Sequence, residues 1–499
     1  MDKRMKLVIL FVGTLILLLF CYFRLKPIFF QTVPYTYDQG RDFLQAQEIM
    51  RDKHFTLLGP TTGIPGIYHG VWWYYFLAIP YFFSRGNPLG FLLFLFLVAL
   101  VQTILFSWFL KREFGVIPAL MFATLVAISP YFIGMSFFAI SSVQNLPVLL
   151  FLFYATHQFL KKKAPLFLFL IFLALGFSFE SEVPFGLFLI PSYISTIFLT
   201  RQFKLFFNSP KKVAFAVCGL IIPMVPRILF ELRHSFLQTK AVLAYLSKPV
   251  FYNPHSFQSI FSERTTVFLH YYLVLFPDSN LVLAWLTLLI TLFGLIYGYK
   301  KLNQHPRLYL NFLGSLFVSM FLLSLFYKDT FWANYFEGLS YYYIIFIALA
   351  SSMLILERKK TLAALPWLLL CLLLLVGVFN LVQNIRTSAP KKIEGMREQL
   401  TVVKKIYNQE KNNSFCVRIY TPPVIPYTYR YIFDYYAASH HFQLPQDTFV
   451  KGRCWYIIER DEYAFRVDDW RKQNIPRNST LIQKEGISDN VRIELWEKP

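Results

Sequence analysis

Residues 31–85 read QTVPYTYDQGRDFLQAQEIMRDKHFTLLGPTTGIPGIYHGVWWYYFLAIPYFFSR, and this stretch is the best guide to how the whole chain is organised. It is a long polar run between a first apolar segment and all later ones, and it keeps charged side chains close to the expected membrane. Asp38, Arg41 and Asp42 open a short predicted helix. Glycine and proline residues at 59–66 then bend the chain before an aromatic run. We predict that this loop holds the functional site.

The composition excludes a soluble protein. Of the 499 residues, 56% are hydrophobic and 19% aromatic, the mean hydropathy is +0.46, and many apolar blocks are long enough to span a bilayer. The formal charge of +21 would suit a nucleic-acid binder, but the basic residues are scattered between apolar blocks instead of forming a stripe on a soluble domain. We therefore expect an all-α polytopic membrane protein that has no nucleic-acid partner.

Eleven apolar segments have the composition of membrane spans. The first is interpreted as a retained helix and not as a cleaved signal peptide, because no small-residue cleavage site follows it. The segments are 7–23, 89–110, 116–135, 146–160, 166–179, 185–200, 213–230, 281–299, 308–326, 341–356 and 362–382. We expect them to form one transmembrane domain over residues 1–386.

The charge distribution predicts the orientation. With the N-terminus inside the cell, the inner connections carry 18 Lys and Arg against 3 Asp and Glu, whereas the rest of the chain up to residue 386 carries 13 against 11. Basic residues accumulate on the cytoplasmic side of membrane proteins, so we expect a cytoplasmic-membrane protein with long outer loops at 24–88 and 234–280. Counting the apolar stretch 68–83 as a span would invert this arrangement. We therefore interpret that stretch as an interfacial or re-entrant helix.

After residue 386 the sequence is soluble in character, and the odd number of spans places residues 387–499 outside the cell. Strands are predicted at 416–420, 455–459 and 491–496, and helices at 429–439 and 468–473. We therefore expect a small extracytoplasmic α/β domain. We hypothesise that Cys416 and Cys454 form a disulfide if this part lies in an oxidising compartment.

Asp38 has two interpretations. Directly before a predicted helix over 39–51, it is a candidate N-cap whose carboxylate accepts backbone N–H bonds. As a charged group held at a membrane surface, it is also a candidate catalytic residue. Asp42 lies one helical turn further on, so both carboxylates can face one cleft with the Arg41 guanidinium beside them. Two acids and a fixed cation suit the deprotonation of an acceptor and the stabilisation of an anionic leaving group.

Other candidate binding residues lie near the predicted outer ends of the spans. Each also has a structural interpretation: hydrogen bonding for the histidines, an interfacial belt for the aromatic run 72–75, and solvation or snorkelling for the charged groups. In the functional interpretation they bind a phosphate or stack on a sugar ring. These candidates are His69, Tyr74, Glu180, Glu182, Arg233 and His234.

Four sequence elements together point to a known family. They are Asp38-Gln39-Gly40-Arg41-Asp42 in the first outer loop, Tyr68-His69-Gly70-Val71-Trp72-Trp73-Tyr74-Tyr75 before the second span, Phe230-Glu231-Leu232-Arg233-His234 after the seventh, and Asn334-Tyr335 in a later outer loop. With these elements the chain resembles the GT-C superfamily of integral-membrane glycosyltransferases, in particular protein O-mannosyltransferases and aminoarabinose transferases. The resemblance covers roughly residues 1–386.

The resemblance implies that a sugar carried on polyprenyl phosphate is transferred with inversion to an acceptor on the outer face, a glycan, a lipid or a protein. The position that matches the family's catalytic base is Asp38, with Asp42 orienting the acceptor or the sugar. Arg41 or Arg233 would hold the donor phosphate by bidentate hydrogen bonds. Asn334 and Tyr335 would take part in substrate binding.

The sequence also departs from the family pattern. The second acid that commonly follows the first is Gln39 here, and a Lys-Pro-Pro element is replaced by His69-Gly70-Val71. An acid after the third span is replaced by Ser142, Gln144 and Asn145, and a His-Tyr pair by Asn334-Tyr335. These losses speak against assistance by a divalent metal ion, so we assign no residue to a metal and name no cofactor.

Two other functions stay open. A lipid-carrier flippase or transporter would place paired charges near the middle of several spans, whereas the predicted spans carry almost none apart from Arg227 near an outer end. An inactive relative that acts as a surface scaffold through its C-terminal domain would explain the replaced motif residues. Binding of a polyprenyl-phosphate sugar would argue against the scaffold, and sugar transfer would identify the enzyme.

Overall fold

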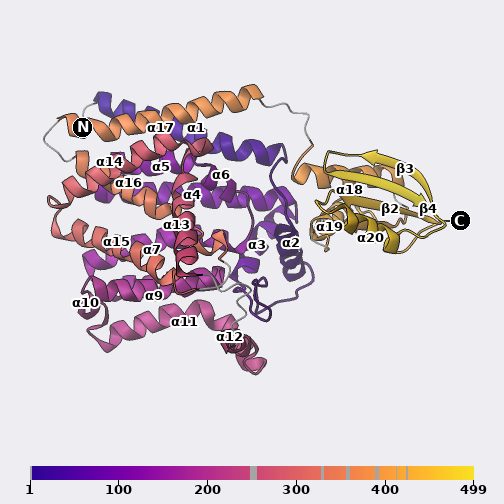
Figure 1. The fold of residues 1–499 in the computed structure, drawn as a ribbon, viewed down its shortest axis with the longest axis horizontal. Coiled ribbons are helices and arrows are strands. Elements are labelled where there is room, and N and C mark those ends of the chain that lie inside the picture. Colours follow the sequence, from indigo (N-terminus) through magenta and orange to yellow (C-terminus); the bar gives the residue numbers. More distant parts are fainter. Residues whose placement is uncertain are drawn as a thin grey trace.

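The structure, a computed structural model, describes residues 3–247, 256–327, 331–355, 360–387, 393–411, 413–422 and 425–498. Figure 1 shows a bundle of helices that run side by side and, beyond one end of it, a smaller part that contains a sheet and the C-terminus. The helix α2 lies between the two parts (Figure 1). The architecture therefore separates an apolar bundle from a polar C-terminal part.

Each of the eleven predicted spans corresponds to a helix. Seven helices in the described part of the chain are long and apolar enough to cross a membrane, while α5, α8 and α9 are shorter apolar helices. The eleven are α1 (Lys3–Phe29), α4 (Pro88–Phe114), α5 (Val116–Ile128), α7 (Asn145–Lys162), α8 (Pro165–Ser181), α9 (Val183–Leu199), α11 (Pro210–Arg233), α14 (Leu281–Tyr299), α15 (Gln304–Ser324), α16 (Ser340–Ile355) and α17 (Lys360–Thr387). The predicted all-α polytopic membrane fold is confirmed.

The predicted continuous span over 116–135 is wrong, because the helix breaks at Ser129. Pro130 begins the separate helix α6 (Pro130–Met135), and proline has no N–H with which to continue the hydrogen-bond ladder of α5. The buried Arg24 of α1 donates instead to the carbonyl oxygens of Val126 and Ala127, at 2.7 and 3.2 Å. A buried cation thus satisfies the backbone groups that the proline leaves unpaired.

The remaining helices of the membrane part are short. The stretch 68–83 does not form a helix throughout: α3 begins at Trp72 and has 13 residues, about 20 Å, against roughly 30 Å for the hydrocarbon core. This length agrees with an interfacial or re-entrant helix. The others are α2 (Tyr37–Met50), α3 (Trp72–Ser84), η1 (Ser141–Gln144), α10 (Phe203–Phe207), α12 (Leu237–Ser247), α13 (Phe257–Leu273), η2 (Pro277–Ser279) and η3 (Ala333–Phe336).

The C-terminal part is the expected α/β structure. Its elements are α18 (Met396–Glu410), β1 (Val417–Tyr420), α19 (Tyr427–His440), β2 (Arg453–Glu459), α20 (Ala464–Asn474), β3 (Thr480–Gly486) and β4 (Val491–Glu497). The strand order is β1-β2-β4-β3, with β1 parallel to β2 and the other pairs antiparallel. A disulfide joins Cys416 and Cys454, as hypothesised. The division at residue 386 stays a prediction, since residues 388–392 lie outside the described ranges.

Close backbone contact docks the C-terminal part on the first outer loop. A Cβ on Gly40 of α2 would lie 2.5 Å from the backbone nitrogen of Thr428 in α19, so only glycine allows these helices to touch. The buried Tyr431 of α19 donates to the carbonyl oxygen of Gly86 at 2.6 Å, and Gln47 of α2 donates to Asp434 at 2.9 Å. The C-terminal part therefore helps to position α2.

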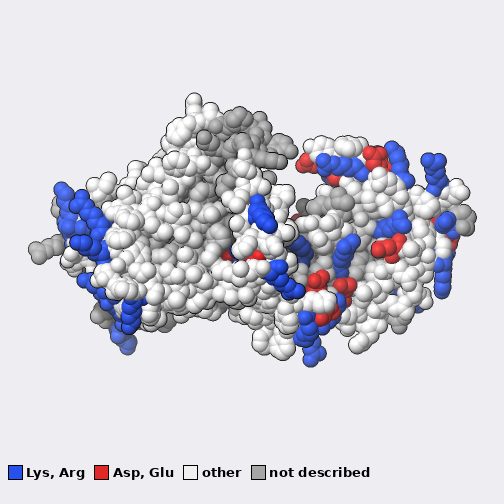
Figure 2. All heavy atoms as spheres, turned by 90° about the horizontal axis from the view of Figure 1, so that it is seen from below, with Lys and Arg blue, Asp and Glu red and all other residues white. Residues whose placement is uncertain are grey.

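On the face in Figure 2, charged side chains lie mostly toward the two ends of the long axis, with Lys and Arg at both ends. Figure 2 shows Lys and Arg side chains gathered at the end of the bundle away from the C-terminal part, whereas Asp and Glu appear only toward the other side on this face. The apolar surface between these ends carries large exposed side chains such as Phe11, Leu289 and Leu375. The structure is therefore that of a multi-pass membrane protein with one basic end.

Candidate active site

The N-terminus of α2 leaves the Asp38 side chain out of the helix cap. The buried Gln39 accepts a hydrogen bond from the backbone N–H of Thr36 at 3.0 Å, so Thr36 is the N-cap and the helix begins at Tyr37. The interpretation of Asp38 as the N-cap is therefore wrong. Its side chain is 52% exposed, and its carboxylate is available to groups outside the helix backbone.

Arg41 lies between two carboxylates. Its Nη1 is 2.8 Å from Asp38 Oδ1, and its Nε donates to Asp42 Oδ1 at 2.8 Å. The indole Nε1 of Trp73 in α3 donates to the other oxygen of Asp42 at 2.8 Å. Asp42 is fully buried, and this burial raises its pKa to about 6 although the Arg41 charge opposes the rise. Asp42 thus fixes Arg41 against α3, and Arg41 orients Asp38.

The loop over residues 59–70 is tightly turned and lies against α8. The His69 N–H donates to the Pro60 carbonyl at 2.8 Å and the Gly59 N–H to the His69 carbonyl at 3.0 Å. Next along the chain, the Gly70 N–H donates to the carbonyl of Glu180 at 2.6 Å, and a Cβ on Gly70 would lie 2.1 Å from a carboxylate oxygen of Glu180. Glycine at this position therefore lets the loop lie directly on α8.

His69 is a neutral, buried side chain. Its Nδ1 accepts a hydrogen bond from the Val183 N–H at 3.3 Å, and its Nε2 lies 3.8 Å from Glu182 Oε2. Burial lowers the pKa of His69 to about 3, and burial also raises the pKa of Glu182 well above its usual range. Burial therefore disfavours the charged form of both side chains.

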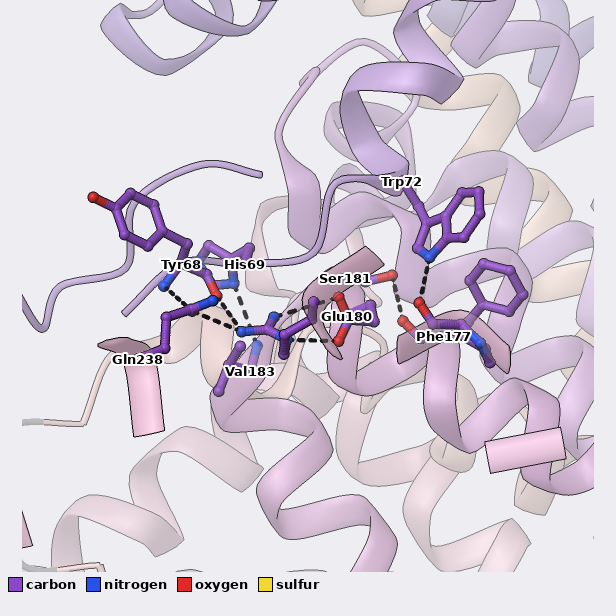
Figure 3. A network of polar contacts seen from close by, with 10 residues as sticks. Tyr68, His69, Trp72, Phe177, Glu180, Ser181, Val183 and Gln238 are labelled. Atoms are coloured by element: carbon purple, nitrogen blue, oxygen red, sulfur yellow. Dashed lines mark hydrogen bonds and ion pairs between the residues drawn. The ribbon is translucent and has the colours of Figure 1, made fainter. Parts of the chain in front are cut away.

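Arg227 of α11 clamps this loop to the bundle through Tyr68, Glu180 and Gln238, which are labelled in Figure 3. Its Nε donates to Glu180 Oε1 at 2.7 Å, and its Nη1 donates to the Tyr68 carbonyl and to Gln238 Oε1, both at 2.9 Å. Gln238 Oε1 also accepts from the Tyr68 N–H at 3.0 Å, and Trp72 Nε1 donates to a carbonyl oxygen of α11 at 2.7 Å. Three helices and the first outer loop are thus joined by one partly buried cation.

A cavity of about 590 Å³ lies beside the Asp38–Arg41 pair. The buried hydroxyl of Ser142 in its wall has no hydrogen-bond partner among the described residues, so the wall offers an unpaired polar group to a ligand. Its polar lining residues are Asp38, Arg41, Thr61, Thr62, His69, Ser141, Ser142, Glu182, Tyr245, Tyr327, Asn334 and Tyr335.

The rim of this cavity is apolar and exposed. Leu187 of α9, Val242 of α12, Phe326 and Trp332 all line it, and the exposed fraction of Phe326 is 79% and that of Trp332 is 61%. Large apolar side chains exposed on a membrane protein face lipid. The cavity therefore combines a charged inner wall with a rim suited to hydrocarbon.

The structure brings together six of the eleven candidate residues and separates the others. The six that line the cavity are Asp38, Arg41, His69, Glu182, Asn334 and Tyr335. Asp42 and Tyr74 are buried behind Arg41, so the expectation that both carboxylates face one cleft is wrong for Asp42. Glu180 is held by Arg227, whereas Arg233 and His234 are exposed at the end of α11 and do not line the cavity.

Sequence reasoning missed three residues at the site. Arg227 was noted only as a charge near the end of a span, although a cation in an apolar helix predicts a buried partner. Ser142 was noted only as the replacement for an acid. Glu337, which accepts a hydrogen bond from Tyr131, is buried near Glu182 and had no motif to mark it. Across the described ranges, no three His, Cys, Asp or Glu side chains converge as metal ligands.

Neither a protein-family model nor a curated protein matches the sequence. Among solved structures, the chain is similar to ArnT from Cupriavidus metallidurans bound to undecaprenyl phosphate, with a TM-score of 0.59 and 10% identity over 98% of this chain and 98% of that chain. Its similarity to ArnT in the apo state has the same TM-score and identity, over 99% of this chain and 98% of that chain. At this identity the likeness concerns the fold alone. Along nearly its whole length the chain therefore has the fold of ArnT.

Proposed function

We propose that this protein is a glycosyltransferase that moves a sugar from a polyprenyl-phosphate carrier to an acceptor on the outer face of the membrane, with inversion. The observation that carries the proposal is the cavity in which Asp38 and Arg41 meet an apolar, lipid-exposed rim. A hydrocarbon tail can pack on the apolar rim, and a phosphate can accept hydrogen bonds from the Arg41 guanidinium inside the cavity. Among solved structures with this fold, ArnT has been crystallised with undecaprenyl phosphate.

Asp38 is the proposed general base. Its carboxylate takes the proton of the acceptor hydroxyl, the acceptor oxygen forms a bond to the anomeric carbon, and the bond from that carbon to the phosphate oxygen breaks. The products are the glycosylated acceptor, polyprenyl phosphate and protonated Asp38. Attack from the side opposite the leaving phosphate inverts the anomeric centre.

Arg41 is the proposed partner of the departing phosphate. It is the one Lys or Arg among the described residues that line the cavity. The Arg41 Nε donates to Asp42 at 2.8 Å, and Trp73 holds Asp42 at 2.8 Å, so the guanidinium is oriented before the substrate binds. Asp42 is buried and acts through Arg41, so we assign it as a positioning residue and not as a residue that touches substrate.

Four further lining residues are proposed to bind the sugar. Glu182, His69, Asn334 and Tyr335 surround the space beyond the Asp38–Arg41 pair. A neutral His69 whose Nδ1 accepts from Val183 has its Nε2–H left as a donor, and the carboxyl oxygens of Glu182 supply acceptors. Tyr74 and Glu180 support the wall, and Arg233 and His234 are left without a proposed contact to the donor.

The proposed orientation follows the charges. The basic end of the bundle lies away from the C-terminal part (Figure 2), which supports an orientation with the cavity and the C-terminal part on the outer side of a cytoplasmic membrane. Nucleotide sugars are made inside the cell, so an outer-face transferase needs a donor that arrives through the lipid phase. This requirement agrees with the apolar rim.

The test is a transfer assay on the purified protein in lipid. A panel of radiolabelled polyprenyl-phosphate sugars is supplied with membrane extract, and transfer to an acceptor or slow hydrolysis by water is measured. Asp38→Asn is expected to lose about 10²- to 10⁴-fold in rate, the usual contribution of a general base. The matched control is Asp52→Asn, an exposed acid after α2 that lines none of the cavities described. If Asp38→Asn retains the wild-type rate, Asp38 is not the base; binding of a donor without any transfer would favour a flippase or scaffold.

A further inference from the structure

A second cavity, of about 790 Å³, lies on the other side of Arg41. One wall belongs to α2, with Arg41, Leu44, Gln45 and Glu48, and the opposite wall belongs to β1, α19 and α20 of the C-terminal part. Arg41 lines this second cavity, which we call the acceptor-side cavity, as well as the cavity beside Asp38. The two spaces therefore meet at the residue that pairs with Asp38.

The charges that line the acceptor-side cavity balance one another. Its charged lining residues are the cations Arg41, Arg418 and Arg430 and the acids Glu48, Asp434 and Asp447. The Arg430 and Asp447 side chains are exposed, so both can form hydrogen bonds to a ligand. Balanced charges that are open to hydrogen bonding suit a neutral ligand that carries many hydroxyl groups.

Two aromatic faces are held in place at this cavity. The Trp470 ring packs on Tyr420 and Tyr456, with ring centroids 5.5 and 5.9 Å apart, and Tyr427 packs on Tyr37 at 4.8 Å. Both Trp470 and Tyr427 line the cavity. Aromatic rings stack on the apolar face of a sugar ring while polar neighbours bind its hydroxyls. Tyr37 is also the neighbour of Asp38 in sequence, which links this wall to the base.

Part of the polar lining is oriented before a ligand binds. Arg418 Nη1 donates to the carbonyl of Asn474 at 3.1 Å and to its side-chain oxygen at 3.3 Å. Asp434 accepts from Gln47 at 2.9 Å. Ordered polar groups lose little conformational entropy on binding, which favours recognition of a polar ligand.

We propose that the acceptor-side cavity binds the acceptor and that this acceptor is a neutral saccharide. The inference rests on the proposed function and adds to it the chemical class of the acceptor. A saccharide hydroxyl in the acceptor-side cavity would pass Arg41 to reach the Asp38 carboxylate. The donor sugar would lie in the other cavity, beside Asp38. A phosphorylated lipid would need an excess of cations and an apolar wall, whereas the charges that line this cavity balance. A Ser/Thr peptide is the remaining alternative and is an outcome of the test.

The experiment uses the full-length protein in lipid nanodiscs with the donor identified by the transfer assay. The acceptor probes are maltotriose, chitotriose and mannotriose, tested beside lipid A and a Ser/Thr peptide library. Asp447→Asn and Arg430→Gln are expected to raise the KM for the saccharide acceptor about tenfold each, the effect of losing one hydrogen bond to a charged group, while the KM for the donor changes less than twofold. The control is Asp469→Asn, an exposed acid on α20 outside the cavity, which is expected to change neither KM.

The outcomes separate this inference from the proposed function. If the wild type hydrolyses or transfers the donor sugar but neither binds nor glycosylates any of the neutral saccharides, the acceptor inference is overturned and the proposed function stands. Transfer to lipid A or to peptide that is insensitive to Asp447→Asn and Arg430→Gln overturns it in the same way. If the wild type neither hydrolyses nor transfers any donor sugar, the proposed function fails first and the acceptor inference fails with it.

Discussion

Arg227→Met is expected to release the first outer loop from the bundle. The mutation removes the guanidinium that pairs with Glu180 at 2.7 Å, and the two side chains are 12% and 1% exposed, so solvent screens the pair very little. Removing one partner of a buried ion pair costs about 3–5 kcal/mol, because the other charge is left uncompensated. That free energy corresponds to a change in the local opening equilibrium on the order of a hundredfold to several thousandfold.

Amide hydrogen exchange on the protein in nanodiscs measures this opening locally. The Gly70 N–H, which donates to the Glu180 carbonyl at 2.6 Å, and the amides of residues 59–69 are expected to exchange on the order of a hundredfold faster in Arg227→Met. The control is Arg233→Met, an exposed arginine on the same helix. The pair of changes Arg227→Met and Glu180→Gln is expected to restore much of the protection, because no charge is left buried. If exchange in the loop is the same in Arg227→Met as in Arg233→Met, the clamp does not hold the loop.

Two further outcomes follow from the packing of α2. Burial raises the pKa of Asp42 from 3.8 to about 6, so the native state binds its proton more tightly than the unfolded chain and the stability from this group is lost as the pH rises from about 4 through 6. Asp42→Asn should therefore remove up to about 3 kcal/mol of that pH dependence. The measurement compares the thermal unfolding of the two proteins from pH 4 to 7. Parallel pH profiles would contradict the burial argument. Gly40→Ala should loosen the docking of the C-terminal part at a cost of about 1–3 kcal/mol, because its Cβ would lie 2.5 Å from the backbone of Thr428. Limited proteolysis compared with Gly13→Ala, whose Cβ would meet nothing within 4 Å, checks this, and equal cleavage rates would refute it.

The hydropathy pattern was sufficient for most of the membrane part. Ten of the eleven predicted spans each correspond to one helix, because a backbone in lipid must satisfy its own hydrogen bonds and has few alternatives, and the span 116–135 is divided between α5 and α6. The failure at Ser129 has a local cause that the apolar pattern does not contain, namely the missing N–H of Pro130. In the C-terminal part, β3 and α18 were missed. The residues of β3 are largely exposed at the sheet edge, so they lack the alternation that predicts a half-buried strand.

The site could be predicted only in part. Asp38 and Arg41 were identified because charges next to apolar spans are rare and usually functional. The N-cap interpretation of Asp38 failed because Gln39 caps the helix through a contact that depends on the backbone conformation at Thr36. The roles of Glu180 and Arg233 depend on which cation of α11 reaches α8, and Arg227 does so because its side chain lies on the buried side of that helix.

The sequence by itself determined the class of protein, the positions of the apolar helices and the loop that carries the charged residues, because hydropathy and charge act on each segment separately. Only the tertiary structure decided which of those residues share a cavity. That outcome depends on contacts between segments far apart in the chain: Gly40 against Thr428, Arg227 against Glu180, and Arg41 between two cavities. Such contacts are set by the packing of whole helices against one another, which no local pattern records.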